Sequence, residues 1–85
     1  MVYFFRVMKM SMTFGERIRR LREIREINQT QLGAALQMTQ RKISYIERDQ
    51  CEPSLADLVA LCRYFEVSAD YLLGLAESPQ IEYKK

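Results

Sequence analysis

The segment that follows Thr39 carries hydrogen-bonding side chains at nearly every position. These side chains are Gln40, Arg41, Lys42, Ser44 and Tyr45. Glutamine can pair with the edge of adenine and arginine with O6 and N7 of guanine, so residues of these types can read base pairs in a DNA major groove. Ile43 and Ile46 lie among them at the spacing of one helix face, which predicts an amphipathic helix with its polar side chains outward. A solvated helix surface without a ligand is the alternative.

Repeated capping signals predict the helices that would position this segment. Thr13 and Glu16 form a capping-box pattern, and Asn28 and Gln31 repeat it. The predicted helices run from Thr13 to about Ile27, from Asn28 to Leu36, from Thr39 to Glu47, from Ser54 to Phe65, and from Ser68 to a stop at Gly74. Only a short break at Gln37-Met38 separates the second helix from the third. Two short helices joined by a tight turn are the geometry that inserts the second helix into a major groove.

Each of these helices carries apolar residues at helical spacing. The predicted faces are Phe14, Ile18, Leu21 and Ile24 on the first helix, Leu32, Ala35 and Leu36 on the second, and Leu55, Leu58, Val59, Cys62 and Phe65 on the fourth. A chain of 85 residues has room for one modest core. The sequence therefore predicts an all-α bundle of five helices.

The charge of the chain is distributed unevenly. Residues 1–49 hold ten Lys or Arg against five Asp or Glu, whereas residues 50–85 hold three against six. A basic side and an acidic side would let the protein approach a polyanion in one orientation, although a mixed, solvated surface would have the same totals.

Several classes of function are not expected. The chain has no histidine, and Cys51 and Cys62 do not form a CxxC pair, so no standard structural zinc site, and no cofactor, is predicted. No nucleophile stands with an adjacent base, so no catalysis is expected. The apolar run over residues 1–5 is too short to cross a bilayer and lacks the features of a signal peptide. These observations predict a cytoplasmic protein with reduced thiols.

The chain resembles a known family over roughly Phe14 to Gly74. The resemblance is carried by Gln29-Thr30-Gln31-Leu32, Leu36, Thr39 to Glu47, Pro53-Ser54-Leu55, and Val67-Ser68 through Leu72-Leu73-Gly74. These residues resemble the Xre family of lambda-repressor-like helix-turn-helix domains. The resemblance implies a five-helix bundle whose third helix reads DNA.

Roles for individual residues follow from this resemblance. It implies that Gln29 holds a DNA phosphate at the start of its helix, and that Arg22 and Glu47 form an internal ion pair. The implied groove-facing residues are Gln40, Arg41, Lys42, Ser44 and Tyr45, and Thr39, which caps their helix, is also expected to bind DNA. One of Arg17, Arg19, Arg20 and Arg25 is also expected to contact a phosphate. The alternative is a solvated face, which is more common for an Arg-rich helix paired with Glu.

The chain departs from the family at three positions. Gln37, Asp49 and Glu66 stand where the family commonly has glycine. If the backbone there requires a positive φ, each non-glycine residue costs on the order of 1 kcal/mol, least at Asp49. Cys62 stands at a small core position, which favours a buried, inert thiol over a redox sensor.

The predicted organisation is an N-terminal extension over residues 1–12, a helix-turn-helix domain over 13–75 and a tail over 76–85. Val2 to Met8 is rich in residues favoured in strands, and could form a short strand that pairs with a second subunit, or be an upstream translation artefact. Binding of this segment to a membrane surface is a weaker hypothesis.

The function predicted from these features is that of a transcriptional regulator. We expect a repressor that binds a palindromic operator as a homodimer, with half-sites ~34 Å apart. The alternative is an antitoxin that binds a toxin protein and represses its own promoter.

Overall fold

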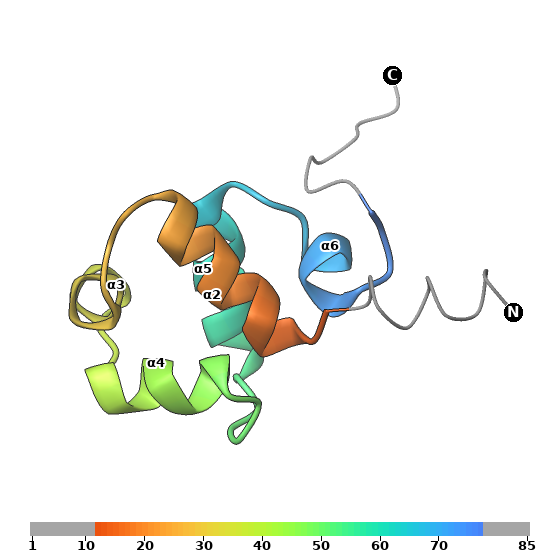
Figure 1. Ribbon diagram of the computed structural model, residues 1–85. Helices are drawn as coiled ribbons and strands as arrows, with labels where there is room; N and C mark the ends of the chain where they lie inside the picture. Colours follow the sequence, from red (N-terminus) through yellow and green to blue (C-terminus); the bar gives the residue numbers. More distant parts are fainter. Residues whose placement is uncertain (1–11, 78–85) are drawn as a thin grey trace, which may run out of the picture.

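The structure is a computed structural model and describes residues 12–77 (Figure 1). Its helices are α2 (Phe14–Ile24), α3 (Gln29–Leu36), α4 (Gln40–Glu47), α5 (Leu55–Phe65) and α6 (Ala69–Leu73). The predicted all-α fold with five helices is confirmed for this part of the chain. The strand considered for Val2 to Met8 lies outside the described residues. No helix in residues 12–77 combines the length and hydropathy needed to span a membrane.

Every one of these helices begins at the residue predicted to cap it. The side-chain oxygens of Thr13, Asn28 and Ser54 accept a hydrogen bond from the backbone N–H three residues later, and the side chain at that position accepts one from the backbone N–H of the cap residue. Thr39 and Ser68 also accept a hydrogen bond from the backbone three residues on. These bonds satisfy amide groups that the first turn of a helix leaves without partners. Local side-chain chemistry therefore fixes where each helix begins.

One fully buried aliphatic residue from each helix meets in the core. These residues are Ile18, Leu32, Ile43, Leu61 and Leu72. The helix α2 contacts α4 and α6, while α5 contacts α3 and α6 (Figure 1). Burial of such a side chain contributes about 1.5–3 kcal/mol relative to its exposure. The core thus ties α3 and α4 to the rest of the bundle.

Some of the predicted apolar faces are wrong. Ile24 is 67% exposed and Leu55 is 82% exposed, and Val59 and Ala35 are exposed as well. The inward face of α5 instead includes Leu61, which the predicted face left out. Because α5 is apolar on several sides, the spacing alone allows more than one inward face, and the contacts with α3 and α6 select one of them.

The ends of the helices explain the three departures from glycine. Gln37, Asp49 and Glu66 all adopt positive φ, at 58°, 59° and 58°. Glu26 does so too, at 58°, and this was not predicted. With Glu26 in this left-handed conformation, α2 ends at Ile24 rather than near Ile27, as was expected. At each of these positions the chain turns, and a non-glycine residue adopts the positive φ with some strain.

Candidate nucleic-acid interface

The turn between α3 and α4 is held by close backbone contacts. Gln37 ends α3 in the left-handed conformation, and the amide of Met38 donates to the carbonyl of Gly33 at 2.8 Å. A Cβ at Gly33 would lie 2.5 Å from the carbonyl oxygen of Met38, so only glycine fits there without a shift. Thr39 then caps α4 through the amide of Lys42 at 3.0 Å. The direction of α4 is therefore set within a few residues of the end of α3.

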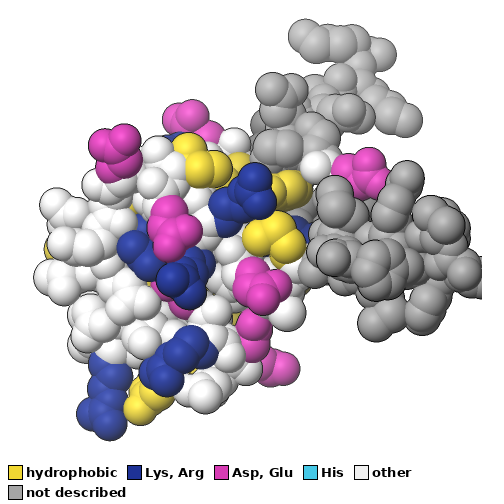
Figure 2. Space-filling view, in the orientation of Figure 1, with side chains coloured by type: hydrophobic (Ala, Val, Ile, Leu, Met, Phe, Trp, Pro, Cys, Tyr) yellow, Lys and Arg dark blue, Asp and Glu magenta, His cyan; other side chains and the backbone are white. Residues whose placement is uncertain are grey.

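The helix α4 separates its apolar residues from its polar residues. Ile43 and Ile46 are buried, whereas Gln40 and Arg41 are exposed. Thr39 is exposed as well, and Ser44 and Tyr45 are partly exposed. In Figure 2, Lys and Arg side chains lie along the lower edge, where Figure 1 places α4, and across the middle of the view. Acidic side chains lie among them, so this view does not show a uniformly basic face.

Arg41 is held beside an aromatic ring. Its Nε donates to the Tyr45 hydroxyl at 3.3 Å, and its guanidinium carbon lies 5.7 Å from the ring centroid. Arg48, which the sequence analysis did not single out, lies 5.2 Å from the same centroid. The spacing of Arg48, three residues after Tyr45 on one helix face, was the available signal. These contacts place two cations around one ring on the outer side of α4.

Lys42 lies apart from the other predicted contact residues. Its Nζ is 2.8 Å from Oδ2 of Asp57 in the first turn of α5. The hydrogen bond between them raises the pKa of Lys42 and lowers the pKa of Asp57. In this structure Lys42 thus ties α4 to α5.

A chain of polar side chains, here called the glutamine relay, runs from the interior to the start of α4. It consists of Arg22, Glu47, Gln29 and Gln40. Nε of Arg22 is 2.6 Å from Oε2 of Glu47, and Nη2 is 3.1 Å from Oε1. Oε1 of Glu47 also accepts from Nε2 of Gln29 at 3.0 Å, and Oε1 of Gln29 accepts from Nε2 of Gln40 at 2.6 Å.

The inner end of this relay is buried. Glu47 is 6% exposed, and its hydrogen bond raises the pKa of the Arg22 guanidinium. The third nitrogen of that guanidinium donates to the carbonyl of Ile27 at 2.9 Å, so the ion pair that the resemblance implies also holds the end of α2. Among the described residues, no buried side-chain nitrogen or oxygen lacks a hydrogen-bond partner. The pair is therefore fully satisfied, as a buried ion pair must be to be tolerated.

The other arginines in and just after α2 differ in their contacts. Arg25 donates to the carbonyls of Tyr64 at 3.1 Å and Phe65 at 3.0 Å, at the C-terminus of α5. Arg17 donates to the carbonyl of Met12 and lies over the ring of Tyr71. Two of the four candidates for phosphate contact are thus engaged with the protein itself. The other two are exposed; Arg19 pairs with Glu23, and Arg20 has no partner among the described residues.

Asp49 joins the loop after α4 to the start of α2. Its carboxylate accepts from the amide of Gly15 at 2.9 Å and from the hydroxyl of Thr13 at 2.6 Å. A Cβ at Gly15 would collide with the carbonyls of Ile46 and Glu47, so α2 packs directly on the end of α4. Asp49 therefore stabilises the N-terminus of α2, where a negative charge is favoured.

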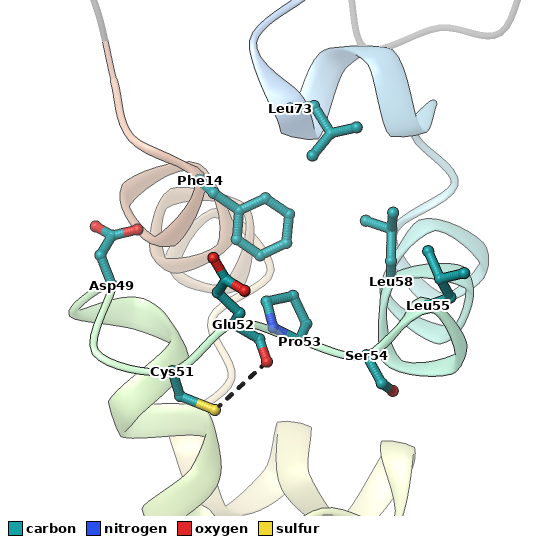
Figure 3. Close-up of a pocket in the computed structure, with 9 residues that line it drawn as sticks. All are labelled: Phe14, Asp49, Cys51, Glu52, Pro53, Ser54, Leu55, Leu58 and Leu73. Atoms are coloured by element: carbon teal, nitrogen blue, oxygen red, sulfur yellow. Dashed lines mark hydrogen bonds between the residues drawn. The ribbon is translucent and has the colours of Figure 1, made fainter.

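The hollow drawn in Figure 3 is lined by none of the residues of the glutamine relay. It has a volume of about 540 Å³ and opens between α2, the start of α5 and α6. Its lining residues are Phe14, Asp49, Cys51, Glu52, Pro53, Ser54, Leu55, Leu58 and Leu73. The ionisable side chains in that lining are carboxylates and a thiol, which do not suit a phosphate. Cys62 lies beside the core, and burial raises the pKa of its thiol, as expected for an unreactive cysteine.

A family model described as a helix-turn-helix domain matches residues 13–72. The chain belongs to this helix-turn-helix family. The match includes all of α2 to α5 and most of α6, and it confirms the resemblance to lambda-repressor-like domains.

Relatives of this helix-turn-helix chain include regulators and repressors. It is 33% identical over 66 residues to an uncharacterized HTH-type transcriptional regulator of Bacillus subtilis, covering 78% of this chain and 59% of the relative. It is 32% identical over 75 residues to the immunity repressor protein of Bacillus phage phi105, covering 85% and 52%. The chain thus spans little more than half the length of these relatives.

Solved structures show the same helical architecture. The P22 c2 repressor, in complex with a synthetic operator, superposes with a TM-score of 0.73 at 36% identity, covering 78% of this chain and all of that one. The restriction-modification controller protein C.AhdI of Aeromonas hydrophila gives a TM-score of 0.65 at 25% identity, covering 71% and 91%. The chain therefore shares the helix-turn-helix fold of these proteins.

Proposed function

We propose that the protein is a repressor that binds a specific operator through the outward face of α4. The observation that carries this proposal is the rigid connection of α3 to α4, with buried Ile43 and Ile46 on one side of α4 and exposed Gln40 and Arg41 on the other. A helix presented in this way enters a major groove with the side chains near its N-terminus against base edges.

The contacts divide into two kinds in this proposal. Gln40, Arg41 and Ser44 face base edges, where Arg41 would pair with guanine and Gln40 with adenine. Gln29 and Thr39, at the N-termini of α3 and α4, would hold phosphates, because helix N-termini bind anions through free amides. Tyr45 supports Arg41 from its ring and hydroxyl.

We further propose that the protein binds a palindromic operator as a homodimer. Leu55, Val59, Leu73 and Leu75 are all exposed on or just after α5 and α6. Leu55 and Leu73 line the same hollow, and exposed apolar side chains that lie close together are typical of a surface that contacts another protein. A dimer matches the two-fold symmetry of a palindrome. The DNA that it binds would lie in the cytoplasm. No specific observation favours the antitoxin alternative, and the relatives named above are regulators and repressors.

Binding to the DNA upstream of the protein's own gene, measured across a salt series, tests the proposal. The wild type should prefer this DNA to random duplex, and its affinity should fall steeply with salt. Arg41→Ala should lose about 1–3 kcal/mol on the preferred site and little on random DNA. Arg63→Ala removes the same charge from an exposed position on α5 and serves as the matched control. Equal binding of all sequences by the wild type would disprove the proposal.

A further inference from the structure

The glutamine relay connects the carboxylate of Glu47, which can only accept hydrogen bonds, to the exposed side-chain amide of Gln40. The carboxylate of Glu47, paired with Arg22, has no hydrogen to donate. Gln29 contacts Oε1 of Glu47 at 3.0 Å, so it must turn its NH₂ group toward that carboxylate. The oxygen of Gln29 is thereby directed to Gln40, which must in turn present its own NH₂ group, at 2.6 Å.

This chain of constraints fixes the direction of an amide that could otherwise face either way. An isolated glutamine amide can rotate by half a turn and exchange its donor and acceptor. With one N–H of Gln40 used on Gln29, the amide has one N–H and its carbonyl oxygen left for a ligand. A donor and an acceptor in a fixed order match the N7 acceptor and N6 donor of adenine in one orientation only.

We propose that Glu47 is a positioning residue that sets the base preference of Gln40 from a distance, through Gln29. This inference rests on the proposed function, because it requires that α4 reads DNA. It differs from a purely structural role of the Arg22–Glu47 pair. A structural role would weaken binding to all sequences alike, whereas a positioning role changes the preference at the one base that Gln40 contacts.

Selection of binding sites from random DNA duplexes separates these roles. The wild type and Gln40→Ala are compared first, and the base position whose preference is lost in Gln40→Ala is the one that Gln40 reads. Glu47→Gln keeps the size of the side chain but can both donate and accept, so it releases the direction of Gln29. We expect it to reduce the preference at that same base from on the order of tenfold to about twofold, with other positions unchanged.

Two further variants complete the experiment. Gln29→Met leaves the Arg22–Glu47 pair in place but breaks the relay, and it should give the same narrow loss; adding Glu47→Gln to it should then cause no further loss of preference. Glu23→Gln makes the same chemical change in the exposed pair with Arg19 and should leave every preference unchanged.

The outcomes separate the inference from the function beneath it. A wild type that selects no sequence disproves the proposed function and the inference with it. A wild type that selects a sequence, with Glu47→Gln binding more weakly but with an unaltered preference, overturns only the positioning role. If Glu47→Gln does not fold, Gln29→Met decides: a narrow loss at the base read by Gln40 supports the relay, and an unaltered preference overturns it.

Discussion

The side of the bundle formed by α3 and α4 differs in its packing from the side formed by α5 and α6. On the side of α3 and α4, backbones approach so closely that Gly15 and Gly33 have no room for a Cβ, and the buried pair of Arg22 and Glu47 is fully hydrogen-bonded. On the side of α5 and α6, large apolar side chains such as Leu55 and Leu73 remain exposed around an open hollow (Figure 3).

The first side is built to be rigid, whereas the second is suited to association with another protein. A surface that reads base edges must hold its side chains in fixed positions, and the first side does so with backbone contacts and a polar network. An apolar surface needs no such precision, because hydrophobic attraction is not directional. The contrast teaches that the first side should be sensitive to small changes, while the second should tolerate them until a partner is present.

The largest effect is expected from Glu47→Ala. It leaves the guanidinium of Arg22 buried without its partner, which costs about 3–5 kcal/mol of unfolding free energy. Glu23→Ala breaks the exposed pair with Arg19 and should cost less than about 1 kcal/mol. Thermal and denaturant melting of both variants measures the difference. Equal losses in the two would show that burial of the Arg22–Glu47 pair has no special weight.

A smaller but still clear effect is expected from Gly33→Ala. The new Cβ would lie 2.5 Å from the carbonyl oxygen of Met38, and overpacking of this kind costs about 1–3 kcal/mol. Ala34→Gly, the reverse exchange at the next, exposed position, should cost about 1 kcal/mol from helix propensity alone. Denaturant melting should therefore rank Gly33→Ala as the worse variant, although alanine is the better helix former. The opposite ranking would mean that the turn adjusts freely.

A modest, pH-dependent effect is expected from Lys42→Met. The lowered pKa of Asp57 means that the stabilisation is present above its ordinary value of 3.8 and is lost as the pH falls through the lower, folded value. The raised pKa of Lys42 means that it is present below 10.5 and is lost as the pH rises through the higher, folded value. Wild type should exceed Lys42→Met by no more than about 1 kcal/mol between these limits.

Melting of both proteins as a function of pH measures this difference. It should shrink toward zero in strong acid and again in strong base. A constant difference across the whole range would show that the ion pair does not contribute and that Lys42 acts through packing alone.

The smallest effect on folding is expected from Leu55→Ser. The side chain is 82% exposed, so the unfolding free energy of dilute protein should change by less than about 0.5 kcal/mol. Leu61→Ala, in the buried face of the same helix, should cost about 2–5 kcal/mol. Self-association followed by sedimentation equilibrium should weaken in Leu55→Ser if this side forms the proposed dimer. Unchanged association would place the dimer contact elsewhere.

Local sequence patterns were enough to predict where the helices begin and that Ile43 and Ile46 of α4 face inward. Thr13, Asn28 and Ser54 cap helices through bonds to residues three positions away, which is chemistry within a single turn. The spacing of Ile43 and Ile46 likewise orients α4 without information from the rest of the chain. The family resemblance added the pairing of Arg22 with Glu47, which no local pattern contains.

Contacts between residues far apart in the sequence could be assigned only from the folded structure. Lys42 reaches Asp57, Asp49 reaches Gly15, and Gln29 lies between Glu47 and Gln40, all across different elements. Ile24 and Leu55 stayed exposed although they match helical spacing, because no other part of the described chain covers them. Periodicity records which residues share a face of one helix, whereas burial and hydrogen bonding depend on what the packed chain places opposite that face.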